Sequence, residues 1–221
     1  MSTFDPASYG DSCASFYDQL YPTIERGLLA TLRELAGDGP ALELGIATGR
    51  VAIPLRRAGV AVHGIDASPA MIAVFRTRPE AADIPVIAGD FASTPLGGRF
   101  QLIYSLVSTF SLLTTLELQR ACLQNIAAHL TSGGCFVSEN FDGASSFPHV
   151  DMHEYRIDTP SGIRNYRVSY LNTPLSMIDE MARDSGLHLA ARWSDGLRTP
   201  WTPAQPRHLS VYQLAPGPHD A

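Results

Sequence analysis

Lysine is absent from this chain of 221 residues, so every positive side chain other than histidine is one of 16 arginines. The absence excludes a lysine base and any Schiff-base chemistry on lysine. Basic residues also form no long run, the longest being the pair Arg56-Arg57, and the formal net charge is −6. Because proteins bind phosphate backbones through basic surface, nucleic acid is disfavoured as a partner.

Cysteine, long apolar runs and signal segments are also scarce or missing. Cys13, Cys122 and Cys135 are scattered without the spacing of metal ligands, which predicts ordinary thiols in a reducing compartment and no metal site. No apolar run approaches the length of a membrane span, and the first residues lack a basic region followed by an apolar segment. We therefore expect a cytoplasmic protein with no membrane partner.

The most informative stretch that is present reads Ala-Leu-Glu-Leu-Gly-Ile-Ala-Thr-Gly-Arg, at residues 41–50. A second apolar run, at residues 60–65, ends in Asp66. A strand, a glycine turn, a helix and a second strand that ends in an acid are typical of the nucleoside-binding half of a doubly wound α/β fold. Asp66 lies 21 positions after Gly45, about where a carboxylate reaches both hydroxyls of a ribose.

The spacing of the glycines indicates which nucleoside is bound. A dinucleotide fingerprint requires small residues at offsets of zero, two and five, and here those positions hold Gly45, Ala47 and Arg50. Methyltransferases that use S-adenosylmethionine (SAM) have an acid followed by G-x-G-x-G. Glu43, Gly45, Ala47 and Gly49 match that pattern with one glycine replaced by alanine. The spacing favours SAM over a nicotinamide cofactor.

Short apolar runs alternate with helical patterns through the middle of the chain, which predicts right-handed crossovers and a parallel sheet. We expect strands at residues 41–44, 60–65, 85–88, 100–105 and 134–139. We expect helices at residues 50–58, 69–78 and 115–130.

The two ends of the chain follow other patterns. Apolar residues recur at helical spacing over residues 15–35, which predicts a helix that Pro22 divides in two. Residues 153–158 and 164–171 alternate around a turn at 159–162 and predict a hairpin. Thr173 is expected to cap a helix that begins at Pro174 and is closed by Gly186, and residues 187–193 and 208–214 to form an antiparallel pair.

Taken together, these landmarks resemble a class I SAM-dependent methyltransferase of the small-molecule, natural-product type. The resemblance implies a doubly wound, Rossmann-like sheet of seven strands, mostly parallel with an antiparallel last strand, and a small β-hairpin insertion. It implies one domain over residues 1–221, with a helical cap at 1–40 and the hairpin at 150–171 over the acceptor side. The landmarks are residues 16–21, the glycine turn, Asp66, residues 89–91, 100–105, 129–134 and 208–212.

The resemblance also implies a set of cofactor-binding residues. The glycine turn and the helix after it offer backbone N–H groups to the carboxylate of SAM, and Asp66 accepts bonds from the ribose. Asp90 is expected at the adenine amino group and the backbone of Phe91 at a ring nitrogen, with Tyr17 and Tyr21 over the amino-acid end. The full expected set is Tyr17, Tyr21, Glu43, Gly45, Ala47, Gly49, Arg50, Asp66, Ala67, Met71, Asp90, Phe91 and Ser105.

The acceptor is expected to be a small molecule, bound where the parallel strands end. Methyl transfer to a neutral amine needs no strong base, whereas a hydroxyl or carbon acid gains from one. Glu139, His149 and His153 are the candidate bases. An apolar or aromatic acceptor is expected from the aromatic side chains near this edge, Phe110, Phe141, Phe147, Tyr155 and Trp201. The atom methylated, whether O, N or C, and a homodimer stay open.

Two departures from the family pattern leave an alternative open. Ala47 stands where the middle glycine is usual, and Gln101 where aspartate is usual. These features would suit a methyltransferase-like protein that uses SAM as a scaffold, in a cyclase-like or accessory role. A third reading, a nicotinamide-dependent oxidoreductase, is disfavoured by the glycine spacing and by the lack of a tyrosine–lysine pair.

Overall fold

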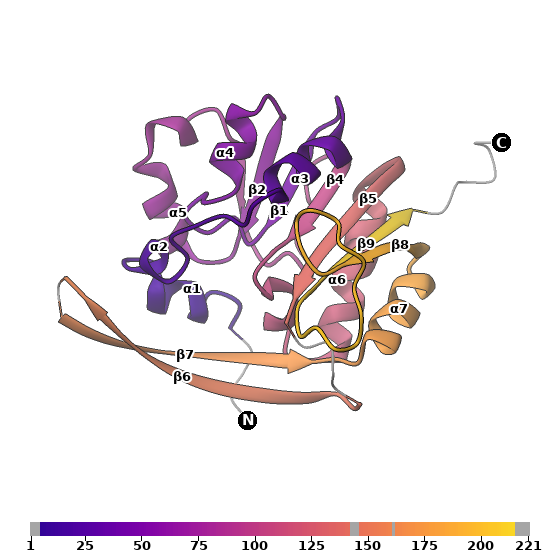
Figure 1. The fold of residues 1–221 in the computed structure, drawn as a ribbon. Helices are drawn as coiled ribbons and strands as arrows, with labels where there is room; N and C mark the ends of the chain where they lie inside the picture. The colour runs from indigo at the N-terminus through magenta and orange to yellow at the C-terminus, as the bar shows by residue number, and fades with distance from the viewer. Residues whose placement is uncertain (1–4, 142–145, 161, 215–221) are drawn as a thin grey trace.

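The computed structural model describes residues 5–141, 146–160 and 162–214. Its core is a seven-stranded sheet in the order β3-β2-β1-β4-β5-β9-β8, and β6 and β7 pair separately as a hairpin (Figure 1). The strands of the large sheet are β1 (Ala41–Leu44), β2 (Val62–Asp66), β3 (Val86–Ala88), β4 (Phe100–Ser105), β5 (Leu130–Asn140), β8 (Leu187–Trp193) and β9 (His208–Leu214). The hairpin strands are β6 (His149–Thr159) and β7 (Gly162–Asn172).

Helices cover both faces of the large sheet. Apolar side chains of α3 and α4 pack on one face, and those of α6 and α7 pack on the other. The helices are α1 (Ser8–Cys13), α2 (Tyr17–Leu20), α3 (Leu28–Ala36), α4 (Ala52–Arg57), α5 (Pro69–Arg76), α6 (Leu116–His129) and α7 (Leu175–Asp184), with short 3₁₀ turns η1 (Pro79–Ala81) and η2 (Thr109–Leu112). The sheet is therefore buried on both sides, as parallel sheets are.

The strand directions confirm the expected fold class. β1 pairs in parallel with β2 and β4, β2 with β3, and β4 with β5, while β9 pairs antiparallel with β5 and β8. The carboxyl ends of β1, β2 and β4 consequently meet on one side of the molecule. In a doubly wound sheet this is where ligands bind.

The fifth strand is longer than expected, because it begins at Leu130 rather than at residue 134. The chain passes directly from α6 into an extended conformation at Leu130. Gly133 adopts φ 73°, and the pairing of β5 with β4 shifts register between Phe100 and Leu102. Gly133 therefore lies in an irregular part of the strand.

The N-terminal region differs most from the sequence-based prediction. Pro22 does interrupt the helical pattern, but the pieces are the one-turn α2 and the separate α3, joined by a segment without helix or strand at residues 21–27. α1 was not predicted, because its sequence has no apolar period. It is held by close packing, since a side chain at Gly10 would come within 2.5 Å of the Cβ atom of Ser68.

The predicted cap of α7 is wrong. Pro174, not Thr173, occupies the cap position, and no side chain caps the helix there. The hydroxyl of Thr173 instead donates to Oε1 of Gln119 at 2.8 Å, in a buried contact between the start of α7 and α6. A buried amide acceptor thus takes the hydroxyl that would otherwise bond to the helix backbone.

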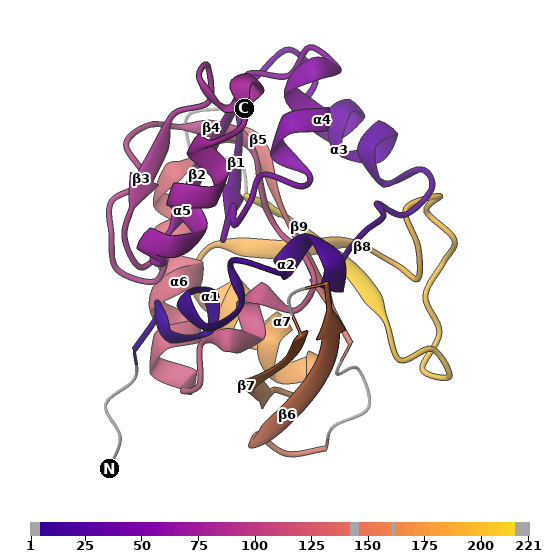
Figure 2. The same cartoon turned by 90° about the vertical axis from the view of Figure 1, so that its left-hand side faces the viewer.

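The hairpin lies beside α1 at the carboxyl ends of the parallel strands (Figure 2). Tyr166 of β7 packs its ring against Phe16 and Tyr9, with centroids 5.8 Å and 6.2 Å away. Residues far apart in the sequence are thereby brought together over the same end of the sheet. We refer to the hairpin (β6 and β7) together with α1 and α2 as the cover, and to α1 and α2 alone as the N-terminal cover.

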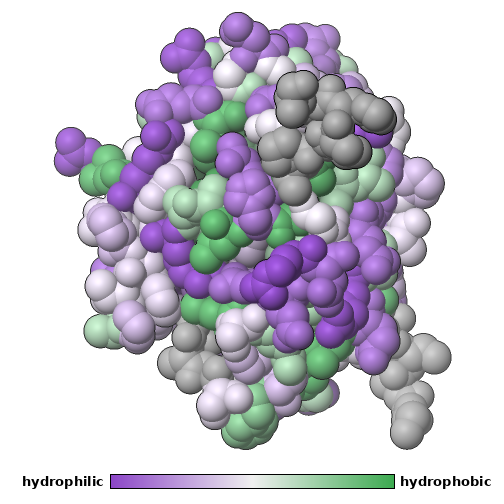
Figure 3. Space-filling view, turned by 90° about the vertical axis from the view of Figure 1, so that its right-hand side faces the viewer, coloured by the Kyte–Doolittle hydropathy of each residue, from purple (hydrophilic) through white to green (hydrophobic). Residues whose placement is uncertain are grey.

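Hydrophobic side chains on the face drawn in Figure 3 form separate patches divided by hydrophilic ones. None of the helices that the structure describes has the length and apolarity needed to cross a lipid bilayer.

One carboxyl group interrupts the apolar interior of the sheet. Glu43 of β1 is buried opposite Tyr104 of β4, whose hydroxyl donates to Oε2 of Glu43 at 3.1 Å. Burial raises the pKa of Glu43 to about 8, although Arg50 and the bond from Tyr104 oppose the shift. The folded protein therefore favours the protonated form of Glu43 at neutral pH.

This shift predicts that the protein loses stability as the pH rises. The folded state binds a proton at Glu43 that the unfolded chain releases at the ordinary pKa of 4.5, so the free energy of unfolding should fall between that pH and about 8. Glu43→Gln should flatten this dependence, as measured by urea unfolding at several pH values. The exposed Glu34→Gln serves as control, and an unchanged slope in Glu43→Gln would refute the assignment.

Candidate functional site

The turn after β1 has a backbone that suits a close ligand. Gly45, Ala47 and Gly49 adopt φ angles of 68°, 49° and 79°, in the left-handed region that favours glycine. A side chain at Gly45 would lie 2.7 Å from the methyl group of Thr109, so no larger residue fits there. Ala47 accepts the same backbone conformation at a cost, because an L residue is strained in it.

Asp66 fixes this turn to the end of β2. Its Oδ2 accepts the N–H of Ala47 at 2.8 Å, and its Oδ1 accepts the N–H of Ser68 at 2.9 Å. Burial raises the pKa of Asp66, while the two backbone hydrogen bonds lower it. A buried carboxylate that still has free lone pairs remains able to accept hydroxyl groups.

The N-terminal helices are tied to the same place. Oδ1 of Asp11, on α1, accepts the hydroxyl of Ser68 at 2.6 Å, directly beside Asp66. Oδ1 of Asp18, on α2, accepts the hydroxyl of Thr48 in the glycine turn at 2.6 Å. These bonds hold α1 and α2 over the ends of β1 and β2.

Tyr17 and Tyr21 lie together, close to Arg50. Their ring centroids are 5.0 Å apart, and the guanidinium of Arg50 lies 5.8 Å from the centroid of Tyr21. Burial raises the pKa of both phenols above the ordinary value, while Arg50 lowers it. At neutral pH both phenols are therefore protonated, so they can donate hydrogen bonds but do not act as bases.

Three further expected cofactor residues differ in their surroundings. Ser105 ends β4, and its buried hydroxyl has no hydrogen-bond partner among the described residues. Met71 is buried under α1, with its N–H bonded to the hydroxyl of Ser68 at 3.0 Å. Ala67 is half-buried between Asp66 and Ser68. The orphaned hydroxyl of Ser105 is the kind of group that a bound ligand satisfies.

Asp90 and Phe91 follow β3. Oδ1 of Asp90 accepts the N–H of Ala92 at 2.9 Å, and the amide of Asn125 donates to the carbonyl of Phe91 at 3.0 Å. Both residues line a cavity of about 920 Å³. The loop that was expected at adenine is thus braced from α6 and opens toward a cavity.

The cavity is formed by α1, the loop after β3, η2 and the hairpin. Its wall contains apolar side chains together with carboxyl, hydroxyl and amide groups. Its apolar lining includes Phe91, Leu112, Leu113, Val150, Met152 and Val168, and its charged lining consists of Asp5, Asp90, Glu154 and Arg167. A volume of this size accommodates a small molecule.

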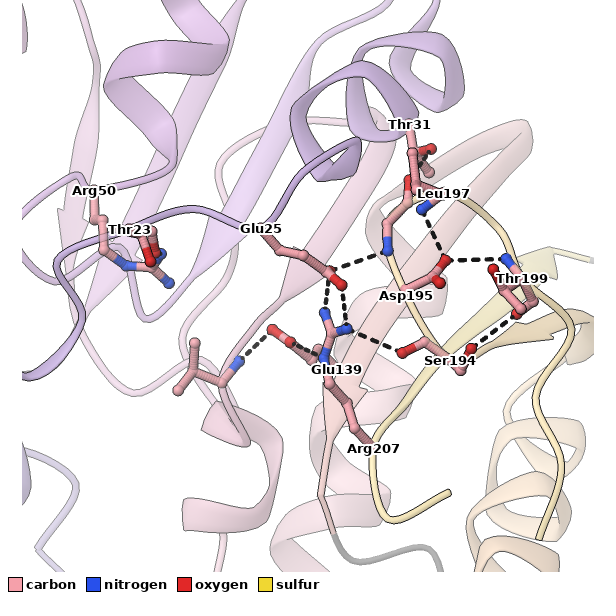
Figure 4. Close-up of polar contacts among 12 residues, drawn as sticks. Thr23, Glu25, Thr31, Arg50, Glu139, Ser194, Asp195, Leu197, Thr199 and Arg207 are labelled. Atoms are coloured by element: carbon pink, nitrogen blue, oxygen red, sulfur yellow. Dashed lines mark hydrogen bonds and ion pairs between the residues drawn. The ribbon is translucent and has the colours of Figure 1, made fainter. Parts of the chain in front are cut away.

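Glu139 is engaged in an ion pair. Nε of Arg207 donates to Oε1 of Glu139 at 2.6 Å, and the N–H of Val107 donates to Oε2 at 2.9 Å (Figure 4). Arg207 also contacts Glu25 through both terminal nitrogens, at 2.8 Å and 2.5 Å. Burial lowers the pKa of Arg207, but the two carboxylates outweigh that effect and raise it above the ordinary value.

His149 and His153 lie on β6, and because they are four residues apart their side chains lie on the same face of the strand. The cavity is lined from β6 by Val150, Met152 and Glu154, which are the alternate residues. His153 stacks on Tyr155 at 5.8 Å between centroids, and His149 lies 3.4 Å from the carboxylate of Asp151. The three candidate bases are not brought together, and none is among the described residues that line the cavity.

The aromatic lining expected for the acceptor is not the lining observed. Phe110 is buried in the core against Phe136, and Phe141, Phe147 and Tyr155 are exposed. Trp201 lies beside His208 in the loop before β9. The spacing along the sequence did not reveal which side of each element faces the cavity.

Two departures from the family pattern have structural explanations. Gln101 lies at the start of β4, at the opposite end from Ser105, and bonds to Thr131 and Gly133. Ala47 packs its methyl group in a cluster with Phe16 and Met71 under the N-terminal helices.

Sequence reasoning missed Tyr9, Glu25, Tyr166 and Arg207. Tyr9 and Tyr166 face each other from α1 and β7, and burial raises the pKa of Tyr166 to about 12. Glu25 and Arg207 are 182 positions apart in the sequence. No local pattern connects such residues, and only the turn composition around Pro22 marks the segment that holds Glu25.

The three cysteines lie in the interior of the protein. Cys13, Cys122 and Cys135 are buried and free, and burial raises the pKa of Cys13 and of Cys135 to about 11. Within the described ranges, no group of three or more His, Cys, Asp or Glu side chains could hold a metal ion.

Comparisons with known proteins agree with this geometry. The family model described as a methyltransferase domain matches residues 41–134. No protein of curated function matches the sequence.

Solved structures match the whole fold. The CcbJ methyltransferase from Streptomyces caelestis is 27% identical with a TM-score of 0.84, over 96% of this chain and 100% of that one. CalS10 from Micromonospora echinaspora, an amino pentose methyltransferase involved in calicheamicin biosynthesis and solved with SAM, is 20% identical with a TM-score of 0.63, over 85% and 88%. DesVI from Streptomyces venezuelae is 18% identical with a TM-score of 0.66, over 92% and 98%.

The family model coincides with the stretch that carries the glycine turn, Asp66 and Asp90, and the similarity to CcbJ extends over both the cover and the closing strands. An enzyme fold, a cofactor motif and a relative thus agree over the same residues. The chain is therefore an enzyme with a methyltransferase domain and the fold of a class I SAM-dependent methyltransferase, and its cofactor is SAM.

Proposed function

We propose that this enzyme transfers the methyl group of SAM to an amine nitrogen of a small natural product with an apolar body. The observation that carries the proposal is the cavity of about 920 Å³ beside Asp90 and Phe91. Apart from Asp90, the carboxyl groups of Asp5 and Glu154 outnumber the single arginine on its wall, Arg167, which favours a cationic or amine-bearing ligand. The apolar groups of Leu113 and Met152 favour an apolar remainder.

The names of similar proteins support the same class of acceptor. CalS10 is an amino pentose methyltransferase, and the glycopeptide N-methyltransferase MtfA, 20% identical with a TM-score of 0.65, covers 86% of this chain. We therefore place the acceptor among amine-bearing products of biosynthetic pathways, held under the hairpin at residues 150–171. Residues 1–221 act in this proposal as one domain.

The residues of the turn and the strand ends fit SAM. Asp66 would accept the ribose hydroxyls, the backbone of Gly45, Ala47 and Gly49 would face the amino-acid part, and the hydroxyl of Ser105 would gain the partner it lacks within the described structure. Asp90 and Phe91 would hold the adenine. SAM supplies an activated methyl group on a positively charged sulfur.

Positioning supplies the catalysis in this proposal. Tyr17 and Tyr21 exclude water as neutral phenols, since burial raises the pKa of each. Glu139 is engaged by Arg207, so a neutral amine needs only to be held in line and loses its proton to water after the transfer.

The first test concerns Asp66. Asp66→Ala should weaken SAM binding by about 1.5–3 kcal/mol through the loss of charge-assisted hydrogen bonds, as measured by titration calorimetry. The matched control is Asp83→Ala, an exposed acid in the turn before β3, which should bind SAM like the parent protein. Unchanged affinity in a folded Asp66→Ala would contradict the ribose assignment.

The second test concerns Ala47. Ala47→Gly relieves the strained φ of 49°, so the free energy of unfolding should stay level or rise by up to about 1 kcal/mol, and SAM affinity should be kept or improved. The same substitution at the exposed helical Ala30 should cost about 1 kcal/mol. A clear loss of SAM affinity in Ala47→Gly would show that the methyl group is part of the pocket.

The third test concerns the base. With an amine acceptor, the pH–rate profile should follow the ionisation of the acceptor and should be the same in His149→Gln and His153→Gln. Rates are measured by formation of S-adenosylhomocysteine across pH with each candidate amine. A limb present in the parent and absent from either variant would identify that histidine as a base and exclude a mechanism by positioning alone.

A further inference from the structure

The turn that follows β4 is strained and lies against the glycine turn. Val107 and Ser108 adopt φ angles of 53° and 56°, which side-chain-bearing residues rarely do, and Val107 is β-branched. The next residue, Thr109, fills the space beside Gly45. A strained backbone persists only where its surroundings hold it.

Glu139 holds this turn from both its side chain and its backbone. Oε2 of Glu139 accepts the N–H of Val107 at 2.9 Å, and the carbonyl of Glu139 accepts the N–H of Ser108 at 3.0 Å. The carboxylate is 7% exposed, so water does not compete for it. The position of Glu139 therefore determines the position of the turn.

Arg207 holds Glu139 and reaches across to the N-terminal segment. It donates from Nε to Glu139, from both terminal nitrogens to Glu25, and from Nη1 to the carbonyl of Ser194 at 3.0 Å (Figure 4). Glu25 also accepts the N–H of Gly196 at 3.0 Å. A planar guanidinium can serve two carboxylates at once, which a lysine ammonium cannot do with the same geometry.

The segment that contains Glu25 connects α2 with α3. Two residues before Glu25, the carbonyl of Thr23 accepts a bond from Arg50 of the glycine turn at 3.0 Å. α2 carries Tyr17, and Tyr21 follows it directly. Thr23 thus attaches the segment to the glycine turn, and Glu25 attaches it to Arg207. We call the carboxyl ends of β1, β2 and β4, with the turns that follow them, the cofactor edge.

We propose that Arg207 is a positioning residue that couples the N-terminal cover to the turn after β4, so that closure of the cover and the geometry of the cofactor edge change together. The proposal rests on the proposed function in that the edge concerned is the one that would hold SAM. Arg207 is not among the described residues that line the cavity.

The critical variant is Glu25→Gln, because Glu25 does not touch the turn. It keeps the shape of the side chain and leaves the Arg207–Glu139 pair in place. Amide hydrogen exchange should become roughly three- to tenfold faster at Val107 and Ser108, as well as in residues 21–27, if the coupling exists. Arg207→Gln should show a larger increase at the same amides.

Cofactor affinity provides the second measurement. Calorimetry with SAM should give a Kd about five- to twentyfold weaker in Arg207→Gln, with Arg207→Lys intermediate and no better than a partial rescue. The control is Arg198→Gln, which removes an ion pair between the loop before β9 and Glu34 of α3 that includes no residue of the turn after β4. Melting curves confirm that each variant is folded at the temperature used.

The outcomes separate this proposal from the proposed function. Unchanged exchange at Val107 and Ser108 in Glu25→Gln overturns the coupling, as does parent-like SAM affinity in Arg207→Gln. If the parent protein itself binds no SAM, the proposed function fails, and the exchange data still decide the coupling. If Arg207→Gln does not fold, Glu25→Gln carries both measurements.

Discussion

Two backbone N–H groups on one buried carboxylate organise the cofactor end of this protein. Asp66 joins the glycine turn to the end of β2 and to the start of α5. Hydrogen bonds to an ionised group are worth about 1.5–3 kcal/mol each, enough to offset the strain of Ala47 in the left-handed region. The contact of α1 with Ser68 lies at the same junction and fixes the N-terminal helices to it.

The charged side chains near the cofactor end serve to hold the structure in place rather than to transfer a proton in the proposed reaction. Arg207 is shared between Glu25 and Glu139, Arg50 lies on Tyr21, and the phenols of the cover are kept neutral by burial. A group that is already paired keeps its geometry when a ligand arrives. This suits a reaction whose rate depends on alignment and on the exclusion of water.

Local signals predicted much of the fold and the centre of the candidate site. β1, β4, β8 and β9 begin and end where apolar runs and turn residues indicated, and Asp66 follows β2 as expected. The failures have one cause in common, because they depend on contacts between distant residues. α1 is held by packing on Ser68, Thr173 is drawn away from its helix by Gln119, and Arg207 acquires its role only when β9 lies beside β5. The expected aromatic residues do not line the cavity, because periodicity does not indicate which side of a strand faces a cavity.

The place of β9 in the sheet has a consequence for biosynthesis on the ribosome. β9 lies between β5 and β8 and follows both in the chain. Every expected cofactor residue therefore leaves the ribosome before Arg207 does, and because domains fold as units, the sheet is completed only after β9 has emerged. Until β9 is inserted, Glu25 and Glu139 lack the guanidinium that bridges them in the folded protein. The contact that joins residues 21–27 to β5 through Arg207 is therefore among the last to form during synthesis.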